Sequence, residues 1–238
     1  MTGVLYIIAK APRAGLAKTR LGRTIGDDAA IVLYKSFLQD LAARFAGAPF
    51  ECGWYVTPAD AWEDLSPLID WGEREMKILF QKAGDLGERQ RELFRGAAAR
   101  GEDKVVLIAA DSPQLTVGVV ERAFSELDRH DLVFGPTFDG GYYLIGMRGF
   151  EDVFHGVPMS VGTELEAIIA AAERAGLSVG RVEATFDVDE EEDLEHLRHL
   201  VEYRPDLSAT RAALEGLGLL HHPLVPVEPS RPADGASG

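Results

Sequence analysis

Short apolar runs recur along the chain and alternate with segments whose apolar residues are spaced three or four apart. The first pattern is typical of strands buried on both faces of a sheet, and the second of amphipathic helices. The runs predict strands over residues 4–9, 51–56, 76–81, 104–110, 131–135 and 142–147, and a last one within 178–189. The spacing predicts helices over 27–45, 61–72, 86–100, 117–127, 163–175 and 190–203. This alternation predicts an α/β fold, with a mostly parallel sheet and helices on both of its faces.

The alternating pattern ends near residue 203, which predicts one domain over residues 1–203. Residues 204–220 predict one more helix, opened by Asp206 or Ser208 and lying outside the core. From residue 221 the chain turns Pro-rich and ends in PSRPADGASG. Such a composition buries too little apolar surface to order itself, so we expect residues 221–238 to form a disordered tail.

The charge of the chain narrows the range of partners. Its 238 residues carry a formal net charge of −15, which argues against nucleic-acid binding through a basic face.

The single cysteine, Cys52, excludes a disulfide framework and a cysteine-based zinc site within one chain, and we expect it to be buried. No apolar run approaches the roughly 20 residues that span a bilayer, and the first residues lack the pattern of a signal peptide. We therefore expect a cytoplasmic protein with no membrane partner.

One basic segment stands out against this acidic background. KAPRAGLAKTRL, residues 10–21, follows the first predicted strand and gathers Lys10, Arg13, Lys18 and Arg20 around Gly15. Cationic side chains and backbone amides on a loop after a buried strand indicate a site for a phosphate-bearing ligand. The segment matches neither the P-loop pattern nor G-x-G-x-x-G. The alternative is a surface loop whose charges are solvated.

Carboxylates follow the later predicted strands. Asp111, Asp139 and the pair Asp187 and Asp189 all lie at strand ends, where open α/β sheets bind their ligands. Facing the basic segment, they would suit Mg²⁺ or Mn²⁺ bound to a nucleotide diphosphate. Each also has a structural reading: Asp111 as the N-cap of the next helix, Asp139 as a turn residue before Gly140-Gly141, and the pair as a strand end and N-cap.

Two glycines in GDLGER, residues 84–89, form a further candidate element. Gly84 and Gly87 would allow a base or ribose to approach the backbone closely. The alternative is a plain turn at the start of the following helix.

Five segments together resemble a known bacterial family, in the same order along residues 4 to about 200. They are KAPRAGLAKTRL, GDLGERQREL, VLIAADSPQL, LVFGPTFDGGYYLIGM and FDVDEEEDL. The family comprises nucleotide-diphospho-sugar transferases labelled radical-SAM/selenodomain-associated transferase or arsenosugar-biosynthesis glycosyltransferase. It is similar to molybdopterin-guanylyl transfer proteins and to phospholactate guanylyltransferases, and the resemblance implies a single GT-A-like, Rossmann-like domain.

The resemblance also implies roles for residues. It places Lys10, Arg13, Gly15, Lys18 and Arg20 at the nucleotide phosphates, and Gly84, Leu86 and Gly87 near the base. It implies that Asp111 holds the divalent metal and that Asp187 or Asp189 completes the site, a choice that spacing leaves open. Asp139 would shape the acceptor side with Gly140 and Gly141, so that Lys18, Asp111 and Asp139 are the predicted catalytic residues.

The chain departs from the family pattern at three places, of which the first and second bear on the acceptor more than on nucleotide binding. Phe138 stands where an acidic residue is expected, Met159 replaces an aromatic residue, and Glu190-Glu191 replace Thr-Pro.

Three functions compete. A glycosyltransferase would move a sugar from a nucleotide-sugar donor to a small-molecule acceptor and release a nucleoside diphosphate. A nucleotidyltransferase would release pyrophosphate, whose greater charge suits a cationic loop. A nucleotide-binding protein without turnover is the third reading. The family label favours glycosyl transfer, whereas the base, sugar, acceptor and oligomeric state are not encoded in any pattern of the sequence.

Overall fold

A sheet of seven strands forms the centre of the structure, a computed structural model that describes residues 3–72, 75–159 and 162–220. The strands run in the order β3-β2-β1-β4-β6-β5-β7. Their bounds are β1 Val4–Lys10, β2 Glu51–Thr57, β3 Lys77–Phe80, β4 Lys104–Ala109, β5 Leu132–Pro136, β6 Tyr142–Arg148 and β7 Val179–Arg181. Pairing is parallel except at β6, which runs antiparallel to both β4 and β5. The predicted α/β class and mostly parallel sheet are confirmed.

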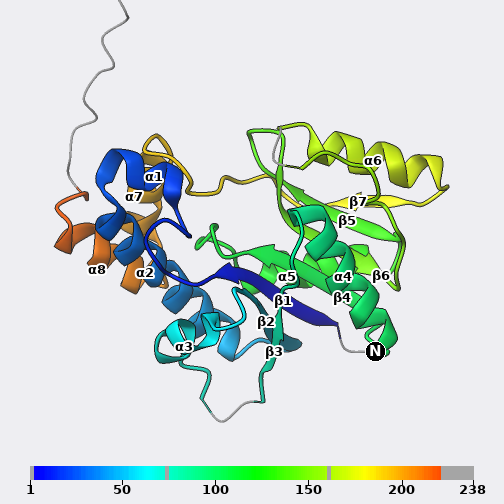
Figure 1. The fold of residues 1–238 in the computed structure, drawn as a ribbon, viewed down its shortest axis with the longest axis horizontal. Helices are drawn as coiled ribbons and strands as arrows, with labels where there is room; N and C mark the ends of the chain where they lie inside the picture. The colour runs from blue at the N-terminus through cyan, green and yellow to red at the C-terminus, as the bar shows by residue number, and fades with distance from the viewer. Residues whose placement is uncertain (1–2, 73–74, 160–161, 221–238) are drawn as a thin grey trace, which may run out of the picture.

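Helices cover both faces of this sheet (Figure 1). They are α1 Thr19–Ile25, α2 Asp27–Ala46, α3 Ala61–Leu65, α4 Leu86–Ala99, α5 Val117–Glu126, α6 Glu164–Arg174, α7 Asp193–Tyr203 and α8 Ser208–Gly216, with the 3₁₀ helix η1 Ser66–Leu68. The side chains of a strand alternate between faces, so Leu5 and Ile7 of β1 pack with α2, α5, α7 and α8, whereas Val4 and Tyr6 pack with α4 and α6. Because helices cover both faces of the sheet, its central strands are apolar along almost their whole length.

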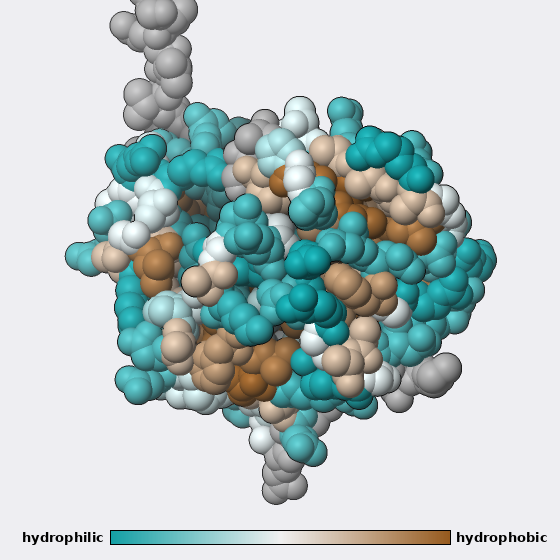
Figure 2. All heavy atoms as spheres, turned by 45° about the vertical axis from the view of Figure 1, so that its right-hand side comes forward, coloured by the Kyte–Doolittle hydropathy of each residue, from teal (hydrophilic) through white to brown (hydrophobic). Residues whose placement is uncertain are grey.

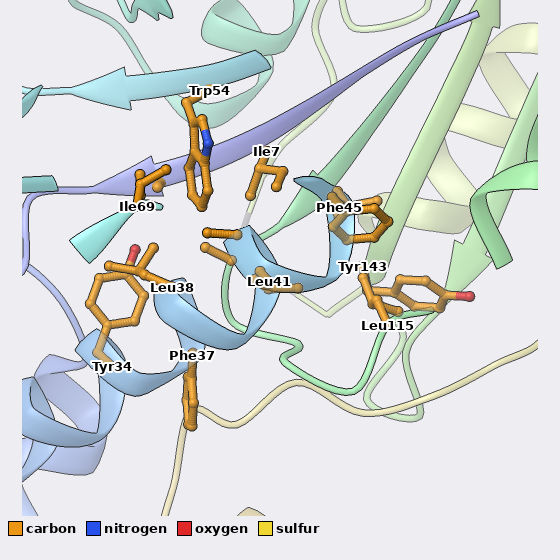
Figure 3. Packing of buried hydrophobic residues seen from close by; sticks show 14 of the residues in the cluster. Ile7, Tyr34, Phe37, Leu38, Leu41, Phe45, Trp54, Ile69, Leu115 and Tyr143 are labelled. Atoms are coloured by element: carbon orange, nitrogen blue, oxygen red, sulfur yellow. The ribbon is translucent and has the colours of Figure 1, made fainter. Parts of the chain in front are cut away.

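Helix α2 makes the largest single contribution to the core on its face. Phe37, Leu38, Leu41 and Phe45 are fully buried, and Figure 3 shows them spread along the helix. Burying each such side chain stabilises the fold by about 1.5–3 kcal/mol. The same helix presents Tyr34, whose hydroxyl accepts a hydrogen bond from the backbone N–H of Lys10 at 3.1 Å. Core packing thereby fixes the end of β1, where the basic segment begins.

Three predicted elements differ from the structure. Residues 19–25, expected within a loop, form α1, because Leu21 is drawn fully into the core. The helix expected over 61–72 is interrupted, since Pro67 starts the 3₁₀ turn η1. Helix α8, expected outside the core, begins at Ser208 and buries Leu214 completely against the α2 face. The predicted tail over 221–238 lies outside the described residues.

The surface is mainly polar. Figure 2 shows one face, on which hydrophobic patches are separated by hydrophilic side chains. Within the described residues, each helix is too short or too polar to cross a membrane. Cys52 is buried, as predicted.

Candidate functional site

A cavity of about 480 Å³ opens at the carboxyl ends of the central strands β1 and β4. The chain leaves β1 towards β2 and β3 on one side and returns to β4 on the other, so this is the point where the strand order reverses. Charged side chains on its wall are Lys10, Lys18, Arg20, Arg89, Asp111, Glu164 and Asp189. The volume falls within the range of roughly 300–1,000 Å³ that small-molecule sites occupy.

The basic segment reaches the cavity through a compact turn. The backbone N–H of Ala11 donates to the carbonyl of Thr57, and the N–H groups of Leu16 and Ala17 donate to that of Arg13. Gly15 has a φ of 75°, which suits glycine, and its position within the turn is structural. Lys18 has a φ of 52°, the one positive φ among the non-glycine residues that the structure describes. This left-handed backbone turns the Lys18 side chain inward.

The Lys18 ammonium lies among protein oxygens. It forms an ion pair with Asp111, a second with Asp189 at 3.0 Å, and donates a hydrogen bond to the Val188 carbonyl at 2.8 Å. Only 1% of its side chain is exposed. Burial by itself lowers the pKa of Lys18, but the charges of Asp111 and Asp189 outweigh it and the pKa is raised. Lys18 is therefore a charged ammonium, and a contact with phosphate would require it to move.

The other three cations of the segment take different directions. Arg20 pairs with Asp189 at 3.2 Å and with Glu190 at 3.3 Å, and Lys10 lines the cavity with an exposed side chain. Arg13 instead pairs with Asp60 at 3.0 Å and with Asp64, both on or next to α3, and does not line the cavity. The structure thus brings together Lys10, Lys18 and Arg20 but leaves Arg13 outside.

Asp111 is not the N-cap of the helix that follows it. That cap is Thr116, whose hydroxyl accepts from the N–H of Val119 at 3.3 Å. The carbonyl of Asp111 accepts from the N–H of Val188 at 3.0 Å, which ties the end of β4 to the segment between β7 and α7. In Figure 1 this segment runs from the β7 side of the molecule across to α7. It carries Asp189 to the same ammonium that Asp111 contacts.

Asp189 is not an N-cap either, because the residue at that position of α7 is Glu192. The carboxylate of Asp193 accepts from the N–H groups of Asp189 and Glu190, both at 2.8 Å, and so orders this backbone. Burial alone would raise the pKa of Asp189, but Lys18 and Arg20 hold it below its ordinary value. Asp189 is therefore an ionised group on the cavity wall.

Asp187 and Asp139 do not line the cavity, but they lie close enough to interact electrostatically with its carboxylates. Burial, together with the charges of Asp189, Asp139 and Asp111, raises the pKa of Asp187 to about 6. Asp139 has the turn role that was its structural reading: its Oδ1 accepts from the Thr137 hydroxyl and from the N–H of Gly141 at 3.2 Å. Gly140 is required there, because it has a φ of 93° and a Cβ would lie 2.3 Å from the Gly162 carbonyl oxygen.

These carboxylates do not make a metal site on their own. Among residues 3–72, 75–159 and 162–220, no three His, Cys, Asp or Glu side chains are grouped so that they could hold a metal ion. Asp111 and Asp189 nevertheless contact one and the same nitrogen atom. Two carboxylates at that spacing fit Mg²⁺ or Mn²⁺ that brings phosphate oxygens and water as its other ligands.

GDLGER forms the start of α4. Asp85 is its N-cap in a capping box with Glu88, with bonds of 2.8 and 3.1 Å. Leu86 lines the cavity, whereas Gly84 and Gly87 do not. Arg89 donates from Nε to the Gly84 carbonyl at 2.9 Å and from Nη1 to Oε1 of Gln81 at 3.3 Å. The turn reading is confirmed, and the same turn positions Arg89 on the cavity wall.

Several polar wall residues were not predicted from the sequence. They are Tyr34, Gln81, Arg89, Gln90, Tyr142 and Glu164. Gln81 is buried and donates to the carbonyls of Ala9 and Tyr55 at 3.3 and 2.7 Å, which closes the ends of β1 and β2. The Tyr142 hydroxyl donates to Gln90 at 2.7 Å. The available signal was position, since Gln81 is the last residue of a predicted strand and Arg89 and Gln90 lie near the start of a predicted helix, beside the glycine turn.

Comparison with known proteins identifies the family and the fold of the chain. Residues 40–161 match the family described as "Uncharacterized protein conserved in bacteria (DUF2064)". A crystal structure from Desulfovibrio desulfuricans G20, provisionally named a nucleotide-diphospho-sugar transferase, shares 31% identity over 91% of this chain and 97% of its own, with a TM-score of 0.81. No curated protein matches the chain.

More distant structures share the fold alone. A cytidylyltransferase from Leptospira borgpetersenii serovar Hardjo-bovis (strain JB197) has 13% identity and a TM-score of 0.56 over 91% of this chain and 93% of its own. The 4-diphosphocytidyl-2C-methyl-D-erythritol synthase of Anaerococcus prevotii DSM 20548 has 10% identity and a TM-score of 0.56 over 84% and 96%. The fold is a single α/β domain of the nucleotidyltransferase or GT-A type, as the resemblance implied.

Proposed function

The chain belongs to the DUF2064 family of bacterial proteins, and on that premise we propose that it is a metal-dependent glycosyltransferase with a nucleotide-diphospho-sugar donor. One observation carries the proposal: cations of the segment after β1 and carboxylates from the ends of β4 and the β7–α7 segment line one cavity. The name of the Desulfovibrio relative supports the donor class. The narrower resemblance to selenodomain-associated and arsenosugar transferases is part of the same proposal.

The wall residues can be assigned to the parts of such a donor and its acceptor. Lys10 and Arg20 would attract the diphosphate, and Leu86, Gln81 and Arg89 would lie beside the nucleoside. Tyr142, Met159 and Glu164 would face the sugar and the acceptor. Asp111 and Asp189 would hold the divalent cation, which when bound offsets the negative charge that develops on the departing diphosphate. Arg13 and Asp139 have no place in this arrangement, because both serve local structure.

The reaction replaces one bond to the anomeric carbon by another. A hydroxyl oxygen of the acceptor forms a bond to that carbon, while the bond between the carbon and the β-phosphate oxygen breaks. The hydroxyl proton passes to a base or to water, and the nucleoside diphosphate leaves. Side chains that bind the diphosphate more strongly as its charge grows lower the barrier.

Nucleotidyl transfer is the second candidate, because the cytidylyltransferases share the fold. An acceptor phosphate would then attack the α-phosphorus of a nucleoside triphosphate, and pyrophosphate would leave. The sequence argument for it was four cations on one loop. Arg13 does not line the cavity, and Lys18 is held by Asp111 and Asp189, so fewer cations are available to pyrophosphate than the sequence implied.

The test separates the two products. The protein is incubated with Mn²⁺ and a panel of nucleotide sugars or nucleoside triphosphates, together with pooled small-molecule acceptors. Release of a nucleoside diphosphate from a nucleotide sugar supports glycosyl transfer, and release of pyrophosphate from a triphosphate supports the second candidate. Tight nucleotide binding with neither product across the panel would favour the reading without turnover and refute both.

A further inference from the structure

The buried ammonium of Lys18 occupies the position that a divalent cation would need. Asp111 and Asp189, the two carboxylates assigned above to the metal, both contact its Nζ atom. Their side chains are 41% and 29% exposed, so each faces solvent as well as the ammonium. A second cation between them would meet the Lys18 charge at contact distance.

Further groups of the protein, besides the two carboxylates, contact the Lys18 ammonium. The Val188 carbonyl accepts its third hydrogen bond, and the rings of Tyr34 and Phe37 lie 5.7 and 5.8 Å from Nζ. An ammonium with three oxygen partners and two aromatic faces has its charge well satisfied within the protein. Lys18 therefore differs from Lys10, whose side chain is exposed on the same wall.

The backbone at Lys18 shows that the position is constrained. A φ of 52° and ψ of 37° is a left-handed conformation that is unfavourable for a non-glycine residue. Lys18 occupies the N-cap position of α1, and its ammonium, which is only a donor, cannot cap the N–H groups of that helix. The strained backbone and the inward ammonium occur at one residue, which points to a role for the charge at that place.

We propose that Lys18 is a positioning residue that serves as an internal counter-cation: it keeps Asp111 and Asp189 together and excludes a free divalent cation until nucleotide arrives. The inference rests on the metal assignment of the proposed function. A divalent cation that arrives bound to a diphosphate brings negatively charged phosphate oxygens, toward which the Lys18 ammonium can turn. A free divalent cation brings no such oxygens. Metal and nucleotide therefore bind together, and the metal alone binds poorly.

The experiment measures Mn²⁺ uptake by the metal-free, full-length protein from the electron paramagnetic resonance signal of free Mn²⁺. The wild type is titrated with Mn²⁺ alone, and then with Mn²⁺ plus UDP, GDP or CDP, corrected for Mn²⁺ held by nucleotide without protein. The same titrations use Lys18→Gln, Lys18→Arg and the control Lys104→Gln. Lys104 pairs with Asp128 at the opposite end of β4, so the control makes the same change in net charge away from the cavity.

We expect Lys18→Gln to bind Mn²⁺ alone on the order of tenfold more tightly than the wild type, because a positive charge in contact with both carboxylates is removed. Lys18→Arg and Lys104→Gln should remain close to the wild type. At least one nucleoside diphosphate should raise Mn²⁺ uptake by the wild type on the order of tenfold, because the two ligands enter together.

Two results would overturn the inference, and they separate it from the proposed function. If folded Lys18→Gln binds Mn²⁺ alone no better than the wild type, while nucleotide still promotes uptake, the metal site stands and the role of Lys18 fails. If neither protein takes up Mn²⁺ with any nucleotide, the metal assignment fails together with it. Should Lys18→Gln not fold by circular dichroism, a wild type that binds Mn²⁺ equally well with and without every nucleotide refutes the exclusion.

Discussion

Replacing Asp40 should uncouple α8 from the rest of the domain. Asp40 is a buried carboxylate of α2 that is 3% exposed, and it accepts three hydrogen bonds from the first turn of α8. The donors are the N–H of Ala209 at 2.9 Å, the N–H of Thr210 at 2.9 Å and the Thr210 hydroxyl at 2.6 Å. A negative charge at a helix N-terminus is favourable, and here it comes from a different helix.

The size of the effect follows from these contacts. Hydrogen bonds to charged groups contribute about 1.5–3 kcal/mol each, but three that share one carboxylate do not add fully. Asp40→Ala also leaves the N–H of fully buried Thr210 without an acceptor. We expect Asp40→Ala to lower the free energy of unfolding by about 3–5 kcal/mol, and Asp40→Asn by about 1–2 kcal/mol because it keeps one acceptor oxygen. At roughly 3 °C per kcal/mol for a chain of this size, Tm for Asp40→Ala should fall by about 10 °C.

Urea unfolding followed by circular dichroism measures these values, with m compared between variants to confirm that only stability changed. Glu121→Ala, at an exposed site on α5, is the control and should stay within about 0.5 kcal/mol of the wild type. An Asp40→Ala loss no larger than that of the control would mean that α8 is not held by this carboxylate. The burial of Leu207 and Leu214 against the α2 face would then account for the position of α8.

Three further changes test the site and its supports. Asp111→Asn should weaken Mn²⁺-dependent nucleotide binding at least tenfold by calorimetry; nucleotide binding that keeps the wild-type affinity in the presence of Mn²⁺ would contradict this. Asp85→Ala removes a capping box from α4 and should cost about 1 kcal/mol in urea unfolding; no change would exclude the cap. Ser178 and Arg148 hold the pKa of Asp131 at about 2, below its ordinary 3.8, so the stability that it contributes is present above 3.8 and lost as pH falls through 2. The difference in unfolding free energy between wild type and Asp131→Asn should shrink over that window, and a difference independent of pH would refute the shift.

The central strands could be read from the sequence because they are apolar on both faces. β4 and β1 are buried almost from end to end, so their patterns contain little that a helix would share. Helix α1 could not be read in this way, because its seven residues TRLGRTI include a glycine and two threonines and bury only Leu21 and Gly22. Its helical state depends on tertiary contacts, including the ion pairs of Arg20 with Asp189 and Glu190, which lie about 170 positions away.

The meeting of Lys18 with Asp111 was predictable from the rule that ligands bind at the carboxyl ends of strands. The direction in which each side chain points was not predictable from this rule. Arg13 and Arg20 lie in the same basic segment of the sequence, yet Arg13 forms ion pairs with Asp60 and Asp64 while Arg20 forms one with Asp189. Asp139 carries the signature of a ligand and of a turn equally well, and only its bonds to Thr137 and Gly141 distinguish the two.

The position of Asp189 depends on a chain of contacts that no single strand supplies. The N–H of Val188 donates to the Asp111 carbonyl at 3.0 Å, its own carbonyl accepts from Lys18, and Asp193 orders the two N–H groups that follow. Val188 itself is fully buried in the core on the α2 side. The last carboxylate of the cavity is thus fixed by an apolar anchor one residue before it and a carboxylate four residues after it. Lys18, from the basic segment after β1, adds two bonds to this segment, one to the Val188 carbonyl and one to Asp189, so a ligand that draws the ammonium away removes both of them together.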